Sequence, residues 1–520
     1  MTNDPRPSFP PTNTSAAATS VIGSTTVPSA APDRAVEAGR GAIFIGAAKV
    51  FFMLSGFVQQ VALARLVTAA GVGAFGAVNS AISMVNNTVV QATIQSVSKF
   101  SAEDDRRAAA VTRAALKIQA GVGLFLGLAF FLGAPAIADF VKATAYVPYF
   151  RIAAAIPLLY SIYAVFIGTV NGQRRFRTQA GFDMTFSTAK TVLLLGGAAF
   201  AGVGGAFAGF AAAALFIVVV AWRVIGAPKT NEPAFPLKRM AAYMLAIGGY
   251  NLFLNVELLY DQPLLHRFAG QIDPSRAGEL AGHYQALRTL ALLPYQALMV
   301  VTFVIFPLVS RSTFNEDREA TRSYVTQTLR YALILATAMG VALGARPAAL
   351  ITVLFPAPYS EGAAALPILV VGQCCLALLA VSCAILNAAG RALPALGLMA
   401  LTVVTGVGSA FVMVPRAALG PDMLTAAATA ASLGMALGFV SSVLYIRTQL
   451  GGSAPLASIL RIAGAAAVAI VVGRLLPGGG KIVGLAITAL VAVIYLGVLI
   501  ALREFGPADQ AKFKKVLRRG

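Results

Sequence analysis

Long apolar segments, separated by short polar connectors, recur along almost the whole chain. Each is about 20 residues long, the length that an α-helix needs to cross the hydrocarbon core of a membrane. Continuous apolar segments argue against a β-barrel, whose strands would read as ~10-residue stretches of alternating polarity. The pattern therefore predicts an all-α polytopic membrane protein with about fourteen transmembrane helices. The predicted spans are residues 41–63, 72–97, 114–138, 151–171, 179–201, 203–225, 241–262, 284–309, 325–345, 363–388, 392–414, 422–446, 457–476 and 482–502.

The second predicted span is the least apolar, because amide side chains recur along it. These are Asn79, Asn86, Asn87, Gln91 and Gln95. A helix that faces lipid could not carry so many polar groups. We therefore expect this helix to face a protein or water-filled interior.

The composition supports a membrane protein and excludes other classes. Hydrophobic residues make up 58% of the chain and charged residues only 12%, far less charge than a soluble domain carries. In a soluble protein the net charge of +20 would suggest binding to nucleic acid. Here basic residues in cytoplasmic loops account for the charge, so no nucleic-acid partner is predicted.

The basic residues also predict the topology. With the N-terminus inside, most of the 40 Lys and Arg residues fall on the cytoplasmic side, as the positive-inside rule requires. Both termini are then cytoplasmic, and the chain is a multi-pass protein of the inner (cytoplasmic) cell membrane. Residues 1–38 are rich in Pro, Ser, Thr and Ala, lack a signal peptide, and are predicted to form a disordered cytoplasmic tail.

Two short motifs occur twice at nearly the same separation. Residues 98–106 (SKFSAEDDR) resemble residues 310–318 (SRSTFNEDR), and residues 171–175 (NGQRR) resemble residues 387–391 (NAAGR). Two repeated motifs in the same order indicate that one structural unit occurs twice in the chain. The predicted organisation is an N-lobe with helices 1–6, a C-lobe with helices 7–12 related to it as a parallel repeat, and two further helices. The ranges are 39–226, 240–447 and 456–503, followed by a basic cytoplasmic tail at 504–520.

Catalytic motifs are absent from the sequence. The Gly-rich run at 478–480 precedes Lys481 but lacks the upstream glycine of a phosphate-binding loop. His266 and His283 lie in one predicted connector, with nothing that resembles a second pair of metal ligands. We therefore predict a transporter rather than an enzyme, with no cofactor and no metal site.

Charged residues inside predicted spans are the strongest functional candidates, because burying a charge in a membrane costs roughly 2.5–3.5 kcal/mol on insertion scales. Glu257 and Asp261 are four residues apart and therefore lie on one helix face. The candidates are the cations Lys49, Arg65, Lys190 and Arg288, the carboxylates Asp183, Glu257 and Asp261, and the polar residues Gln60, Asn87, Gln91 and Asn255.

One interpretation is a central cavity in which cations hold an anionic group such as a pyrophosphate, while carboxylates bind a coupling cation or proton. The alternative is that Lys49 and Lys190 pair with Asp183, Glu257 or Asp261 as structural contacts. Arg65 and Arg288, close to helix ends, could also extend toward the membrane surface.

Several segments resemble the polysaccharide-exporting flippases of the multidrug/oligosaccharidyl-lipid/polysaccharide (MOP) exporter superfamily. ARLV at 64–67 with GAFG at 73–76 is similar to the turn between their first two helices, although the usual acidic pair before Gly76 is missing. Further similar segments are residues 156–157 with 171–176, residues 306–310, and residues 354–359 with 363–364.

The resemblance implies two six-helix lobes in a V that open alternately to either side of the membrane. It also implies a cargo, a polyprenyl-pyrophosphate-linked oligosaccharide of polysaccharide, lipopolysaccharide or O-antigen synthesis, with glycosyltransferases and a polymerase as pathway partners. Two alternatives remain: a cation-coupled multidrug exporter, with Glu257 and Asp261 as coupling groups, and a lipid II flippase. The second fits less well, because only Arg65 matches the several arginines of that pattern.

Overall fold

The computed structural model describes residues 32–229, 231–314, 317–476, 480–506 and 509, and this part of the chain contains helices and no strand. The predicted all-α class is confirmed. Residues 1–31 and 510–520, in the two predicted tails, lie outside the described residues. Helix α1 already begins at Pro32, so the last residues assigned to the N-terminal tail, 32–38, are helical instead.

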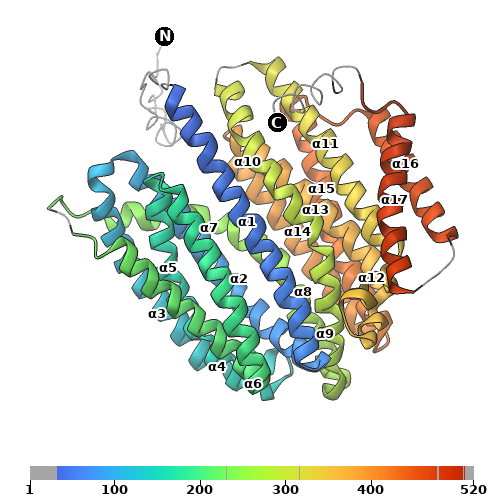
Figure 1. The fold of residues 1–520 in the computed structure, drawn as a ribbon, viewed down its shortest axis with the longest axis horizontal. Coiled ribbons are helices and arrows are strands. Elements are labelled where there is room, and N and C mark those ends of the chain that lie inside the picture. Colours follow the sequence, from blue (N-terminus) through green and yellow to red (C-terminus); the bar gives the residue numbers. More distant parts are fainter. Residues whose placement is uncertain (1–31, 230, 315–316, 477–479, 507–508, 510–520) are drawn as a thin grey trace, which may run out of the picture.

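The long helices run side by side between two ends of a bundle (Figure 1). We call the end at which α1 begins the upper end. The lower end is the one at which α1 turns into α2 and α8 turns into α9. We call α1–α6 the N-lobe and α7–α15 the C-lobe. Figure 1 shows α2–α6 at the left, with α7 of the C-lobe beside α2, most other C-lobe helices to the right of α1, and α16 and α17 at the far right.

The N-lobe has a core of its own, in which Phe75, Phe166, Phe186 and Phe207 are buried together. Its elements are α1 (Pro32–Leu66), α2 (Ala69–Glu103), η1 (Asp105–Arg107), α3 (Ala108–Phe140), η2 (Thr144–Tyr146), α4 (Val147–Ala153), α5 (Ala155–Gly172) and α6 (Phe176–Ile225).

Helix α6 is a hairpin of two helices, because the backbone leaves helical geometry at Ala201 and Gly202. Gly202 has φ +58°, a left-handed conformation that glycine adopts without a steric penalty. Gly197 and Gly205 then bring the two arms together, since a Cβ on Gly205 would lie 2.0 Å from the carbonyl oxygen of Gly197. The reversal falls between the spans predicted at 179–201 and 203–225.

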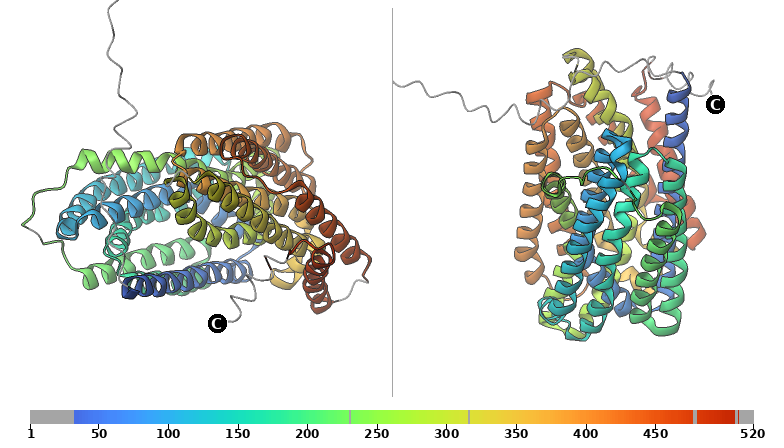
Figure 2. Two further views of the ribbon diagram at one scale, coloured as in Figure 1. Left: turned by 90° about the horizontal axis from the view of Figure 1, so that it is seen from above. Right: turned by 90° about the vertical axis from the view of Figure 1, so that its left-hand side faces the viewer.

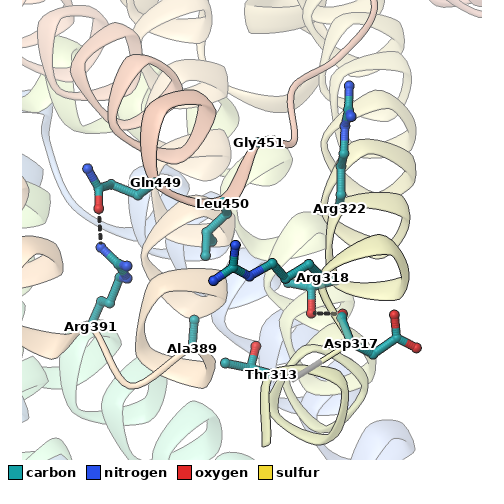
Figure 3. Close-up of a pocket in the computed structure, with 10 residues that line it drawn as sticks. Thr313, Asp317, Arg318, Arg322, Ala389, Arg391, Gln449, Leu450 and Gly451 are labelled. Carbon is teal, nitrogen blue, oxygen red and sulfur yellow. Dashed lines mark hydrogen bonds between the residues drawn. The ribbon is translucent and has the colours of Figure 1, made fainter. Parts of the chain in front are cut away.

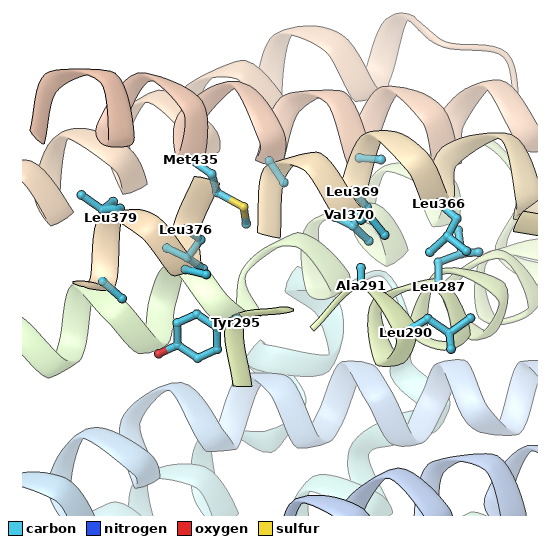
Figure 4. Packing of buried hydrophobic residues seen from close by; sticks show 14 of the residues in the cluster. Leu287, Leu290, Ala291, Tyr295, Leu366, Leu369, Val370, Leu376, Leu379 and Met435 are labelled. Atoms are coloured by element: carbon cyan, nitrogen blue, oxygen red, sulfur yellow. The ribbon is translucent and has the colours of Figure 1, made fainter. Parts of the chain in front are cut away.

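The C-lobe core is built around α13, which lies between α9, α10 and α15 (Figure 4). Leu287 and Leu290 of α9 face Leu366 and Leu369 of α13 in this packing. The C-lobe elements are α7 (Leu237–Leu259), α8 (Asp261–Ile272), α9 (Pro274–Ala291), α10 (Leu293–Phe314), α11 (Arg318–Ala345), α12 (Pro347–Leu354), η3 (Ala357–Ala365), α13 (Leu366–Ala388), α14 (Ala392–Met413), η4 (Val414–Arg416) and α15 (Pro421–Leu450).

The predicted connector between the seventh and eighth spans, residues 263–283, is helical rather than a loop. Helix α8 continues from α7 through Tyr260, whose amide donates to the Val256 carbonyl at 2.8 Å. The chain reverses at Asp273, which caps α9 by accepting a hydrogen bond from the Ser275 amide. The polar residues that suggested a loop instead make an amphipathic hairpin, so α8 and α9 extend the two spans to the lower end.

The second duplicated motif, residues 171–175 and 387–391, forms the same turn in both lobes, whereas residues 315–316 of the first motif lie outside the described residues. The Arg174 amide donates to Asn171 and the Arg175 amide to Val170, at 3.0 and 2.8 Å. In the C-lobe, 216 residues later, the Gly390 amide donates to Asn387 and the Arg391 amide to Leu386, at 3.1 and 2.8 Å. Arg174 (φ 57°) and Gly390 (φ 76°) are both left-handed. The two turns therefore support the predicted internal repeat.

Eleven helices of the described part are long and apolar enough to cross a membrane. One of them is α6, which folds back on itself and corresponds to two predicted spans. Helix α2 is not among the eleven; its amide-rich sequence makes it less apolar than the others. The predicted count of about fourteen therefore stays a prediction.

Helices α16 (Leu456–Leu475) and α17 (Lys481–Ala501) pack against the outer side of the C-lobe (Figure 2). Beyond α17 the chain returns to α11, where the buried carboxylate of Glu504 accepts from Arg330 Nε at 2.6 Å and from Arg461 Nη1 at 3.3 Å. Burial by itself would raise the pKa of Glu504, but hydrogen bonds from Ser458, Arg330 and Arg461 outweigh it and hold the pKa below its usual value.

We expect Glu504→Gln to loosen the contact of α16 and α17 with α11. A carboxylate with a lowered folded-state pKa stabilises the fold above its unfolded pKa of roughly 4.3 and loses this effect as the pH falls through the folded value. The melting temperature of Glu504→Gln should therefore lie below that of the parent protein at pH 7, and the difference should shrink below pH ~4. A difference that is constant with pH would contradict this role of the charge.

Candidate functional site

A buried cation–carboxylate pair lies where the two lobes meet. Arg288 of α9 and Asp261 of α8 are only 3% and 5% exposed, and Arg288 Nε lies 3.5 Å from Asp261 Oδ1. Asp261 also accepts a hydrogen bond from the Tyr284 hydroxyl at 3.0 Å and from the Gln262 amide at 2.9 Å. Arg288 Nη1 reaches Ser80 Oγ of the N-lobe helix α2 at 3.4 Å. This group therefore links the lobes through a buried charge.

The lobes approach so closely because glycines line both sides of their contact. A Cβ on Gly73 of α2 would lie 1.9 Å from the Gly278 carbonyl oxygen of α9, and one on Gly282 would lie 1.9 Å from the Ala69 carbonyl oxygen. A Cβ on Gly76 would likewise lie 2.2 Å from Gln262 Nε2. We call this contact the lower seam. It closes the lower end of the bundle one to two helical turns from Arg288.

Glu257 lies one helical turn before Asp261 and is 1% exposed. Neither of its carboxylate oxygens has a hydrogen-bond partner within the described residues. Two residues before Glu257, Asn255 donates to the Asn251 carbonyl at 2.8 Å and to Thr88 Oγ1 of α2 at 3.5 Å. Because a buried carboxylate without a partner is costly, Glu257 is a candidate for binding a proton or a cation.

Lys49 and Asp183 form a second pair within the N-lobe. Lys49 Nζ lies 2.9 Å from Asp183 Oδ2; the lysine side chain is 51% exposed and the carboxylate 10%. This is one of the pairings that the alternative interpretation allowed. Lys190, two turns beyond Asp183 on α6, instead places Nζ 4.1 Å from the ring centre of Phe210 on the second arm of the hairpin. Within the described part of the chain Lys190 makes no ion pair.

Arg65 lies apart from these groups, at the lower end of α1. Its Nη2 atom reaches the carbonyl oxygens of Leu354 and Val353 at 3.1 and 3.4 Å. These are C-terminal carbonyls of α12, which carry partial negative charge and favour a cation. Arg65 and Lys481 line a cavity of about 410 Å³ between α1, α12 and α17.

The structure thus brings the predicted charges together in pairs rather than around one shared cavity. Arg288 meets Asp261, and Lys49 meets Asp183, while Lys190 and Arg65 have separate surroundings. The predicted polar lining is mixed: Gln60 has a buried side-chain oxygen without a partner among the described residues, Asn87 is half-buried and Gln91 is exposed. Their roles in transport stay a prediction.

Sequence reasoning missed Tyr284 and Ser80, the hydrogen-bond partners of the central pair. Tyr284 lies four residues before Arg288, so the spacing placed both on one helix face. The spacing alone does not show that the Tyr284 hydroxyl reaches Asp261 of α8. No feature of the sequence marks Ser80 as a partner of Arg288, since this contact depends on the approach of α2 to α9.

A larger cavity, of about 710 Å³, opens at the upper end of the C-lobe (Figure 3). Arg318 and Arg322 of α11 line it on one side, and Arg391 on the other, where it donates to Gln449 Oε1 at 2.5 Å. None of the predicted site residues lines this cavity. It lies instead where the two duplicated motifs of the C-lobe meet.

Both histidines are buried, but their surroundings differ. His266 has partners for both ring nitrogens, the Tyr146 hydroxyl at 2.9 Å and the Val141 carbonyl oxygen at 2.8 Å. His283 lies beside Glu279 and Glu361, and one ligand atom from each of these three side chains lies within 4.8 Å of the others. Glu361 supplies the neighbour that the local sequence around His283 did not reveal.

Comparison with known proteins agrees with this architecture. No curated protein matches the chain. Among solved structures, the lipid II flippase MurJ in an inward closed conformation superposes with a TM-score of 0.73 at 13% identity, covering 89% of this chain and 99% of that one. An inward-facing MATE family multidrug resistance transporter of the MOP superfamily gives 0.64 at 14% identity, with 79% and 98% covered.

A MOP superfamily transporter from Pyrococcus furiosus gives a TM-score of 0.57 at 16% identity, with 79% of this chain and 95% of that chain covered. These likenesses define the fold. The family model described as polysaccharide biosynthesis protein matches residues 62–363, more than half of the chain. The chain therefore belongs to this polysaccharide biosynthesis family, and it has the fold of the lipid II flippase and of the MOP superfamily transporters.

Proposed function

We propose that this transporter moves a polyprenyl-pyrophosphate-linked oligosaccharide from the cytoplasmic to the outer leaflet of the inner membrane during surface polysaccharide, lipopolysaccharide or O-antigen synthesis. The observation that carries the proposal is Arg288, a buried cation at the contact of the two lobes, held by Asp261 and by Ser80 of the opposite lobe. A diphosphate that enters between the lobes can replace these partners, because arginine binds phosphate oxygens with two parallel hydrogen bonds.

In this proposal the upper end of the bundle is cytoplasmic. Arg106, Arg107 and Arg174 of the N-lobe and Arg318 and Arg391 of the C-lobe lie in the connectors at that end. Basic connectors are typical of the cytoplasmic side. The lower seam then closes the outer side, and the cargo enters from the cytoplasmic leaflet. Glycosyltransferases and a polymerase of the same pathway would make and consume it.

Lys49 is proposed to attract the anionic cargo within the N-lobe, because its side chain is half exposed although it pairs with Asp183. We expect Lys49→Ala to reduce export by about 10-fold or more, the effect of losing one charge-assisted hydrogen bond. Lipid-linked repeat units should accumulate in the cytoplasmic leaflet, measured by extraction and mass spectrometry. Lys49→Arg, which keeps the charge, is the matched control. Normal polymer yield from Lys49→Ala at normal protein levels would exclude this role.

Glu257 is proposed as the group that couples transport to an ion or proton gradient, because its buried carboxylate lacks a partner among the described residues. We expect Glu257→Gln to fold at least as stably as the parent, since an amide costs less to bury than a charge. Transport by this variant should no longer respond to an imposed pH or sodium gradient. A gradient response equal to that of the parent protein would remove Glu257 from coupling.

The same carboxylate leaves a second cargo class open, a cationic drug exchanged for a cation. Expression in a drug-sensitive host distinguishes the two. Resistance that Glu257→Gln and Asp261→Asn both abolish would favour the multidrug exporter. Unchanged toxicity for every drug tested, together with accumulation of lipid-linked oligosaccharide when the transporter is lost, would favour the flippase.

A further inference from the structure

The three potential metal ligands Glu279, His283 and Glu361 meet at the lower end of the C-lobe, apart from the residues proposed to act in transport. Glu279 and His283 are four residues apart on α9 and therefore share a helix face, and Glu361 of η3 faces them. One ligand atom from each lies within 4.8 Å of the other two. Zinc sites are often built from two ligands that lie four residues apart on one helix and a third ligand from another element.

The surroundings of His283 give a second reason, independent of the two carboxylates, to expect a bound ligand. The histidine side chain is 0% exposed, and its Nε2 atom has no hydrogen-bond partner within the described residues. Its Nδ1 atom lies 3.1 Å from Glu361 Oε2, so the ring nitrogen and the carboxylate oxygen face each other. Two ligands of one tetrahedral zinc ion, each at ~2.0–2.1 Å from the metal, are separated by about 3.3 Å. The distance between Nδ1 and Oε2 therefore matches the separation of two ligands around one ion.

Arg276 contacts the two carboxylates from outside the cluster, so it can orient them without taking the position of the metal ion. Its Nη2 atom binds Glu361 Oε1 at 3.2 Å, the oxygen that does not face His283, and its Nε atom lies 3.9 Å from Glu279 Oε2. Such outer contacts orient the carboxylates that bind a metal. Two carboxylates and one arginine leave a net charge of −1 around a neutral histidine, which favours a cation.

We propose that Glu279, His283 and Glu361 bind a divalent transition-metal cation of the zinc class. One nitrogen and two carboxylate ligands suit zinc, with a fourth position open to water. Glu279 and Glu361 are 42% and 26% exposed, so the ion can enter from the aqueous side. The bound ion ties α9 to η3 beside Gly278 and Gly282 of the lower seam, and it acts independently of the cargo.

The test uses the full-length protein, purified in detergent with an affinity tag that contains no histidine and stripped of metal with a chelator. Background binding should be low, because His266 is engaged at both ring nitrogens and the three cysteines lie within α13. Zinc chloride is added, and bound zinc is measured by elemental analysis and by competition with a chromogenic chelator. Saturation at one zinc per chain and a rise in melting temperature with zinc are expected.

Glu279→Gln and Glu361→Gln should each weaken zinc binding by at least ~10-fold, the usual effect of losing a ligand or its support. Asp139→Asn is the control, an exposed carboxylate near the lower end of α3 and outside the cluster. Arg276→Gln should weaken zinc binding less than either glutamate variant, because it removes a supporting contact and no ligand. The absence of saturable binding, or equal binding by the parent protein and both glutamate variants, would overturn the proposal and leave an ion-pair network only.

Discussion

Replacing Arg288 by glutamine is expected to abolish transport and to destabilise the protein strongly. The change leaves the Asp261 carboxylate, only 5% exposed, without its cation. Breaking a buried ion pair from one side costs about 3–5 kcal/mol, because the remaining charge is buried without compensation. The loss should appear as a lower melting temperature in detergent and as a loss of lipid-linked oligosaccharide export in cells.

The double variant Arg288→Gln/Asp261→Asn separates the two effects. Removing both charges should recover most of the melting temperature, since buried neutral groups of similar shape replace a buried pair at little cost. Export should remain lost, because a cation is needed to bind a diphosphate. Recovery of export together with stability would mean that the pair is a structural contact, and Arg288 would then have no part in cargo binding.

A disulfide across the lower seam is expected to stop the transport cycle. The Cβ of Ala70 lies 3.3 Å from the position that a Cβ on Gly278 would occupy, just below the ~3.5–4.5 Å range of disulfides. Oxidation of Ala70→Cys/Gly278→Cys should therefore join α2 to α9 and keep the lower end closed. Transport should fall to background on oxidation and return on reduction, while cross-linking is followed by mobility on a gel.

Each single variant, oxidised in the same way, is the control for the native cysteines Cys374, Cys375 and Cys383. Full transport by the cross-linked double variant would show that the seam need not open, which contradicts alternating access between the lobes. A double variant that never cross-links under strong oxidation would instead indicate that α2 and α9 do not approach in the membrane.

The fold was predictable wherever a helix is apolar along its length, because the pattern of such a helix depends on the membrane alone. For the amide-rich second span, the sequence predicted its surroundings as well as its helical structure. It was expected to face an interior, and α2 indeed packs its Gly73 and Ser80 against the C-lobe. Residues 263–283 show the limit. Their polarity indicated a connector, but α8 and α9 are helices that bury His266 and His283 and leave Arg276 and Glu279 partly exposed, which no local pattern reveals.

The charged candidates were identifiable from the cost of burying them, whereas their partners were not. Lys49 and Lys190 were both possible partners of Asp183, and the structure pairs Asp183 with Lys49 of α1. Asp261 meets Arg288 because α8 reverses into α9, and Ser80 joins them because glycines let α2 approach. Partners that are distant in the sequence depend on tertiary packing, so an interpretation from one sequence cannot choose among them.

The central claim is that a buried cation at the contact of two helical lobes carries an anionic, lipid-linked sugar across the membrane. Its most direct test is translocation by the purified protein in vesicles, with a polyprenyl-pyrophosphate oligosaccharide placed in one leaflet and detected by a sugar-cleaving enzyme on the other side. The account predicts transfer by the parent protein, none by Arg288→Gln/Asp261→Asn, and competition by polyprenyl pyrophosphate but not by the uncharged polyprenol. Transfer that is equally fast in the double variant, or that the uncharged polyprenol inhibits equally well, would contradict it.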